Sequence, residues 1–119
     1  MKEMIKVKGL QVAPAELEAF LLTHPAVADA AVIPIPDDRA GEVPKAFVVK
    51  ASSVGLEESD RLLIRSIKKH VEKEKSRHKW LVGGVEFVDA IPKSPSGKIL
   101  RRLLRDQEKE KRRQQGSKL

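Results

Sequence analysis

The central part of the chain, residues 27–50, reads VADAAVIPIPDDRAGEVPKAFVVK. It holds two apolar runs with strand propensity, at residues 27–35 and 45–50. The segment between them contains prolines and Gly41, which interrupt regular structure. Because this connection is short, we expect the two runs to pair as neighbouring antiparallel strands.

The flanking segments predict an α+β domain built on this pair. Before it, two short extended pieces flank a glycine turn as in a small hairpin, and a helix with Pro14 in its first turn ends at His24-Pro25. After it, apolar positions predict a helix over about residues 58–75, a strand at residues 85–88 and a last helix from residue 99. The order ββαββαβα indicates helices packed on a small, mostly antiparallel sheet with an N-terminal β-hairpin.

The C-terminal segment is predicted to leave this fold. No large apolar residue lies between Arg105 and Leu119. A helix without an apolar face has no reason to stay on the core, so we expect it to fray near that point. The expected division is therefore a folded domain at residues 1–106 and a flexible, disordered basic tail at residues 107–119.

Length and composition exclude several classes of site. The chain has 119 residues, enough for one ordinary domain, and it has no cysteine, which excludes disulfides, thiolate metal sites and a cysteine nucleophile. The three histidines, His24, His70 and His78, have no metal-ligand spacing, so we predict no metal site. No apolar run suffices to span a bilayer and no signal peptide is visible, so we expect a soluble, intracellular protein without a transmembrane segment.

The net charge of +7 is concentrated near the C-terminus. Residues 1–97 hold 15 Lys and Arg against 14 Asp and Glu, whereas residues 98–119 hold 9 against 3. The nearly neutral body and the scarcity of aromatic residues argue against nucleic-acid binding. A stand-alone interaction module, whose basic tail binds anionic partners, stays open as an alternative.

One loop carries a candidate functional lysine. Residues 92–98 read PKSPSGK and precede the last predicted helix. The Gly-Lys pair lacks the other glycine and the following Ser or Thr of a phosphate-binding P-loop, so that motif is excluded. What is left is Lys98 on a loop stiffened by two prolines, where it could deliver a positive charge to a phosphate or carboxylate. The alternative is an ordinary solvated lysine.

Four motifs, in order, identify a family. They are KVKGLQVAPAELE at residues 6–18, HPAV at 24–27, PD with GEVP within 36–44, and IPKSPSGKILRR at 91–102. Together they closely resemble the C-terminal domain of adenylate-forming, AMP-binding acyl-CoA ligases, in the branch of 4-coumarate–CoA ligase and firefly luciferase. The resemblance covers roughly residues 2–106.

The resemblance implies a function for the domain and its partners. Such enzymes use ATP and Mg²⁺ to convert a carboxylic acid to an acyl-adenylate, and the small C-terminal domain then rotates about a hinge so that CoA can form the thioester. The pockets for ATP and the acid belong to a large N-terminal adenylation domain, which would be the main partner of this chain. Lys2 matches the hinge position. We therefore expect the chain alone to be inactive.

The resemblance also implies roles for individual residues. Lys98 matches the lysine that reaches the acyl carboxylate and the α-phosphate during adenylation. Lys6 and Gln11 match a pair that enters for the thioester step. Gly9, with Lys8 beside it, matches the turn that the pantetheine arm of CoA passes. Without the resemblance, Lys6 would be read as a solvated strand charge, Gln11 as a polar edge residue and Gly9 as an ordinary turn glycine.

One departure from the family pattern and one C-terminal motif add two further predictions. Val82 stands where the family often has a basic residue before Gly-Gly, so Lys79 is the candidate for holding the phosphates of CoA. The chain ends in Ser117-Lys118-Leu119, a peroxisomal import signal when it is the true C-terminus. We therefore expect the peroxisome as the location and its import receptor as a partner.

Overall fold

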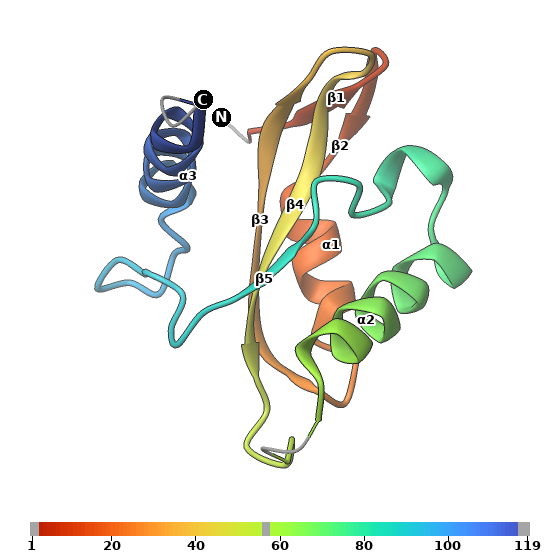
Figure 1. Ribbon diagram of the computed structural model, residues 1–119, viewed down its shortest axis with the longest axis vertical. Helices are drawn as coiled ribbons and strands as arrows, with labels where there is room; N and C mark the ends of the chain where they lie inside the picture. Colours follow the sequence, from red (N-terminus) through yellow and green to blue (C-terminus); the bar gives the residue numbers. More distant parts are fainter. Residues whose placement is uncertain (1–2, 56–57, 117–119) are drawn as a thin grey trace.

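The computed structural model describes residues 3–55 and 58–116. The elements in chain order are β1 (Ile5–Val7), β2 (Leu10–Val12), α1 (Pro14–Leu21), β3 (Val27–Asp37), β4 (Gly41–Lys50), α2 (Asp60–Glu74), the 3-10 helix η1 (Arg77–Lys79), β5 (Val85–Phe87) and α3 (Arg101–Gly116) (Figure 1). This order confirms the predicted α+β fold with its N-terminal hairpin.

The sheet is built around the long hairpin of β3 and β4. Its strand order is β2-β1-β4-β3, and β5 pairs with the second half of β4. The β3–β4 pairing runs antiparallel from Val27 opposite Lys50 to Asp37 opposite Gly41. β1 joins β4 antiparallel at Gly41, whereas β5 is parallel to β4. The sheet is therefore mostly antiparallel, as predicted.

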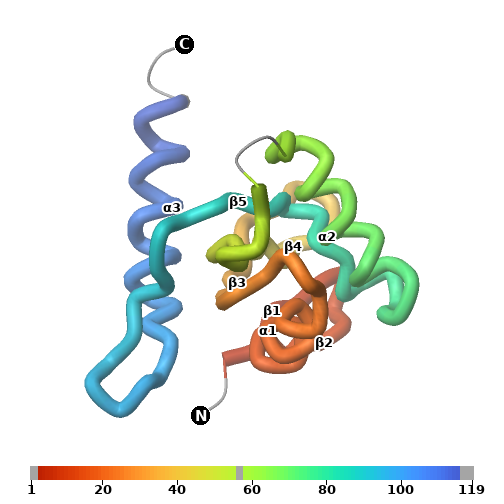
Figure 2. Tube along the Cα trace, turned by 90° about the horizontal axis from the view of Figure 1, so that it is seen from below, coloured from red at the N-terminus to blue at the C-terminus, as the bar shows by residue number. Residues whose placement is uncertain are grey.

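Helices cover both faces of this sheet. α1 and α2 pack together on one face, and α3 lies on the other (Figures 1 and 2). Side chains of β4 alternate between these faces: Lys45 reaches Glu108 on α3, whereas Ala46 and Val48 are fully buried on the opposite side. Aliphatic residues dominate the core, as the shortage of aromatic residues requires; the largest fully buried side chains include Ile5, Leu17, Leu21, Ile33 and Ile67.

The last helix is longer than predicted. Fraying near Arg105 and a flexible segment from residue 107 were expected, but α3 continues to Gly116, so this expectation is wrong for residues 107–116. Ion pairs replace the missing apolar contacts: Lys45 Nζ lies 2.7 Å from Glu108 Oε1 and 2.9 Å from Glu86 Oε1. Lys111 of α3 pairs with the same Glu86. The predicted tail residues 117–119 lie outside the described residues.

Nearby side chains accept hydrogen bonds from backbone N–H groups on the outer edge of β3. The outward N–H of Val32 donates to Glu18 Oε2 of α1 at 2.9 Å, and that of Ala30 donates to the side chain of Asp29. Pro34, next in the same outward row, has no N–H to offer. This edge is therefore protected from pairing with other chains, and it supports the loop that carries Lys98.

Candidate functional site

The N-terminal hairpin brings two of the predicted site residues together. Lys6 and Gln11 are directly opposite each other in the β1–β2 ladder, so their side chains share one face. Lys6 is exposed while its neighbours Ile5 and Val7 are buried. The backbone N–H of Lys6 donates to Glu42 Oε1 at 2.9 Å, which ties the hairpin to β4. The pair is thus presented to solvent from a fixed strand.

Lys8 and Gly9 form the turn of this hairpin. Their φ values are 51° and 81°, as a two-residue type I′ turn requires. The N–H of Lys8 donates to the carbonyl oxygen of Ala40 at 2.8 Å, so the turn rests on the β3–β4 connection. A Cβ at Gly9 would meet nothing within 4 Å. Backbone conformation therefore demands glycine here, and the space beside it is open to a ligand.

The loop that carries Lys98 is closed by hydrogen bonds. Ser94 N–H donates to the carbonyl oxygen of Lys98 at 2.8 Å, and Gly97 N–H donates to the carbonyl oxygen of Ser94 at 2.9 Å. Gly97 adopts a φ of 89°, which suits glycine. The side chain of Lys98 is exposed, and no ion pair joins its ammonium to any residue in the described part of the chain.

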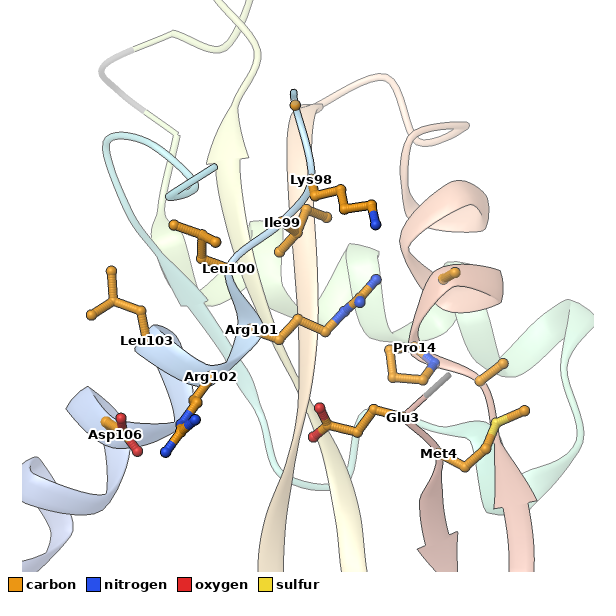
Figure 3. Close-up of a pocket in the computed structure, with 13 residues that line it drawn as sticks. Glu3, Met4, Pro14, Lys98, Ile99, Leu100, Arg101, Arg102, Leu103 and Asp106 are labelled. Carbon is orange, nitrogen blue, oxygen red and sulfur yellow. The ribbon is translucent and has the colours of Figure 1, made fainter. Parts of the chain in front are cut away.

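Lys98 borders an open groove (Figure 3). The groove has a volume of about 960 Å³ and runs between the start of α3 and the starts of β1 and α1. Met4 and Pro14 line one side, and Lys98 and Leu100 line the other. An anionic group placed at this rim would meet a lysine whose charge is not already neutralised within the described chain.

The hairpin and the Lys98 loop occupy different parts of the domain. Figure 1 shows the β1–β2 turn at the upper end of the sheet. The loop between β5 and α3 lies at the lower left of the same view, below α3. The structure thus gathers Lys6, Lys8, Gly9 and Gln11 in one place and puts Lys98 in another. Lys2, the predicted hinge residue, lies outside the described residues.

Lys79 is already engaged within the chain. Its ammonium lies 2.9 Å from Glu16 Oε2, and Lys75 lies 3.0 Å from the same oxygen. The hydrogen bonds from Lys79 and then Lys75 lower the pKa of Glu16 below its ordinary value. Val82 is 61% exposed and carries no charge. A role of Lys79 toward CoA phosphates stays a prediction, and such a phosphate would compete with Glu16.

Sequence reasoning missed an ion pair that supports the site, between Glu18 and Arg101, and the packing role of Gly83. Arg101 of α3 binds Glu18 of α1 through two hydrogen bonds, and this pair anchors the end of the Lys98 loop. Glu18 and Arg101 lie within the family motifs at residues 6–18 and 91–102, so the resemblance to the family was a signal that could have identified them. Gly83 was noted only as part of a Gly-Gly pair; a Cβ there would lie 2.7 Å from the carbonyl oxygen of Pro44, so glycine is required for packing.

The basic residues of α3 are largely neutralised by nearby carboxylates. Lys111 pairs with Glu86, Arg112 with Glu108 and Arg113 with Glu110. This pairing leaves less positive charge for an anionic partner than the sequence suggests. Among the described residues, no group of three or more His, Cys, Asp or Glu side chains could hold a metal ion, and no helix has the length and apolar character needed to cross a membrane.

Comparison with known proteins gives a consistent set of similarities. The family model of the AMP-binding enzyme C-terminal domain matches residues 16–98. Acyl-CoA ligase lcsD of Purpureocillium lilacinum is 56% identical over 106 residues, which are 89% of this chain and 27% of that protein. 4-Coumarate–CoA ligase 1 of Petroselinum crispum is 56% identical over 105 residues, 88% of this chain and 18% of that ligase.

Solved structures agree with these similarities. The crystal structure of Brucella canis acyl-CoA synthetase superposes with a TM-score of 0.83 at 40% sequence identity. The superposition covers 92% of this chain and 20% of that protein. The chain thus spans about a quarter or less of the length of these relatives.

Proposed function

This chain belongs to the family of AMP-binding enzyme C-terminal domains, and on that basis we propose that it is the mobile C-terminal domain of an ATP-dependent acyl-CoA ligase. The proposed reaction has two steps. A carboxylic acid and ATP give an acyl-adenylate and pyrophosphate, and the thiol of CoA then displaces AMP to give acyl-CoA. The similarity to acyl-CoA ligases and 4-coumarate–CoA ligases supports this class. A large adenylation domain would supply the pockets for ATP and the acid.

Lys98 is the proposed residue of the adenylation step. Negative charge develops at the α-phosphate as the carboxylate attacks it, and a fixed cation stabilises that charge. Two observations support the role: the loop is closed by hydrogen bonds, and the ammonium has no ion-pair partner in the described part of the chain. The preorganised position would let Lys98 act without reorganising at the moment of reaction.

The hairpin is the proposed surface of the thioester step. Lys6 and Gln11 lie opposite each other on one exposed face, where they could contact the adenylate together. The open space beside Gly9 could admit the pantetheine arm of CoA past the turn that Lys8 and Gly9 form. Magnesium is not assigned to any side chain of this chain, since the described residues offer no metal-binding cluster.

The arrangement of the two surfaces supports their use in separate steps. The loop between β5 and α3, which carries Lys98, and the β1–β2 turn lie at different ends of the domain (Figure 1). Because the domain is packed around one core, it would move as a unit. A rotation of the domain between the two steps would then present each surface in turn.

A chimeric enzyme tests the proposal. In 4-coumarate–CoA ligase 1 of Petroselinum crispum, the matched C-terminal segment is replaced by this chain. We expect the chimera to convert 4-coumarate, ATP and CoA to the thioester, whereas the ligase without its C-terminal segment and this chain alone do not. A folded chimera no more active than the truncated ligase would contradict the proposal, and so would adenylate formation by this chain alone.

We also propose peroxisomal import through Ser117-Lys118-Leu119, on condition that Leu119 is the last residue of the whole protein. The support is the match of this tripeptide to the import signal. A fluorescent protein carrying residues 107–119 at its C-terminus should enter peroxisomes, and deletion of Leu119 should return it to the cytosol. Import that survives the deletion would contradict the proposal.

A further inference from the structure

One buried carboxylate connects three elements next to the Lys98 loop. Glu18 of α1 is only 6% exposed. Its Oε2 accepts hydrogen bonds from Val32 N–H on the edge of β3 and from Arg101 Nε, both at 2.9 Å, and its Oε1 accepts from Arg101 Nη2. Arg101 is the first residue of α3. Glu18 therefore fixes the start of α3 against both α1 and the sheet edge.

Arg101 follows Lys98 by three residues, so this anchor acts on the loop directly. The loop is a small hairpin whose stem pairs Lys93 with Ile99. Its first side is anchored separately, because Lys93 Nζ lies 2.6 Å from Asp29 Oδ2 on β3. The two ion pairs together attach both sides of the stem to the edge of β3. The pair of Arg101 and Glu18 is the more buried one and the one with two hydrogen bonds.

A two-bonded guanidinium and carboxylate fix orientation as well as distance. Electrostatic stabilisation depends on such precision, since a displacement of about 1 Å can cost on the order of 10²-fold in rate. We infer that Glu18 and Arg101 are positioning residues, which hold the loop so that the Lys98 ammonium reaches the reacting phosphate during adenylation. This inference rests on the proposed role of Lys98. In the described part of the chain, no hydrogen bond or ion pair joins the side chain of Glu18 or Arg101 to the N-terminal hairpin.

The first test concerns the loop itself and needs no enzyme activity. Amide hydrogen exchange is measured by NMR on the 119-residue chain and on Arg101→Gln, Arg101→Lys and Lys109→Gln. Lys109 lies exposed on the same helix and serves as the matched control. We expect exchange at Ser94 to rise about tenfold or more in Arg101→Gln, less in Arg101→Lys, and not at all in the control, with Leu10 in the hairpin unchanged in all of them. Unchanged protection of Ser94 in Arg101→Gln would overturn the inference.

The second test uses the chimera described above and separates the half-reactions. We expect Arg101→Gln to slow formation of 4-coumaroyl-adenylate about tenfold or more, with partial recovery in Arg101→Lys. Thioester formation from preformed adenylate should stay within about twofold of the unmodified chimera, because the hairpin is intact. Equal losses in both half-reactions would indicate a merely structural role and overturn the inference.

Lys98→Ala in the same chimera distinguishes the two proposals. If it leaves adenylation unaffected, the proposed function fails, while the exchange experiment still decides whether Arg101 holds the loop. If Lys98→Ala slows adenylation and Arg101→Gln does not, only the positioning role is wrong. Glu18→Gln is a second variant for the case that Arg101→Gln fails to fold, because the glutamine amide oxygen can still accept the hydrogen bond from Val32 N–H. This variant should also slow adenylation selectively. Normal adenylation in Glu18→Gln would count against the inference.

Discussion

The ion pairs between α3 and the sheet lead to a specific prediction about the stability of the domain. Glu108 is buried against the sheet, with a side chain only 5% exposed, and it accepts hydrogen bonds from Lys45 at 2.7 Å and from Arg112 at 2.8 Å. Glu108→Gln keeps the shape of the side chain and removes its charge. We expect this change to loosen the second half of α3, where no large apolar side chain substitutes for the ion pairs.

The expected loss is about 2 kcal/mol in the free energy of unfolding. A hydrogen bond to a charged group contributes about 1.5–3 kcal/mol, and Lys45 retains Glu86 at 2.9 Å in the variant, which limits the loss. The bond from Arg112 adds little, because its side chain is 44% exposed. With an unfolding entropy of about 2 cal/mol/K per residue, this loss lowers the Tm by about 8 °C.

Urea unfolding at low salt, followed by circular dichroism, measures both effects. Glu110→Gln is the matched control, since Glu110 lies on the same helix but pairs with Arg113 at the surface. The control should unfold as the unmodified chain does. If Glu108→Gln also does so, with unchanged helix content, the reasoning about α3 is refuted.

The same site gives a pH dependence with a definite sign. Burial alone would raise the pKa of Glu108, but hydrogen bonds from Lys45 and Arg112 outweigh it and hold that pKa below its ordinary value. The stabilisation is therefore complete above the unfolded pKa of about 4.3 and is lost as the pH falls through the lower folded value. Over that range the difference in stability between the unmodified chain and Glu108→Gln should shrink. A constant difference would contradict the assignment.

Two further predictions concern other parts of the domain. Gly83→Ala would place a Cβ 2.7 Å from the carbonyl oxygen of Pro44, so urea unfolding should show a loss of about 1–3 kcal/mol; no loss would contradict the packing role. Burial, and then the nearby His70, lowers the pKa of His24, so its stabilisation is complete above about pH 6.5 and lost as the pH falls. His24→Gln should therefore flatten the fall in stability between pH 7 and pH 5, and an unchanged slope would exclude His24 as its source.

The element order could be predicted because its signals are local. Apolar periodicity and breaks at glycine and proline act over a few residues, and they indicate strands β1 to β5 and helices α1 to α3, although not the short 3-10 helix η1. The pairing of Lys6 with Gln11 follows in the same way, since a two-residue turn at Lys8 and Gly9 fixes the register of the hairpin. These features needed no knowledge of distant contacts.

The contacts that were missed join residues far apart in the chain. Glu108 and its partner Lys45 are 63 residues apart, and Arg101 and Glu18 are 83 apart. No local pattern reports such a pair, so α3 was predicted to fray where its apolar residues end. The engagement of Lys79 by Glu16, also 63 residues away, was invisible for the same reason.

The rates of the two half-reactions in the chimera test most directly whether one domain serves two steps. Lys98→Ala should slow adenylate formation by about 10² to 10³ and leave thioester formation from preformed adenylate nearly intact. Lys6→Ala should do the reverse, since Lys6 lies opposite Gln11 on the hairpin surface that is proposed for the thioester step. If both variants slow both half-reactions equally, the assignment of separate surfaces to separate steps is wrong.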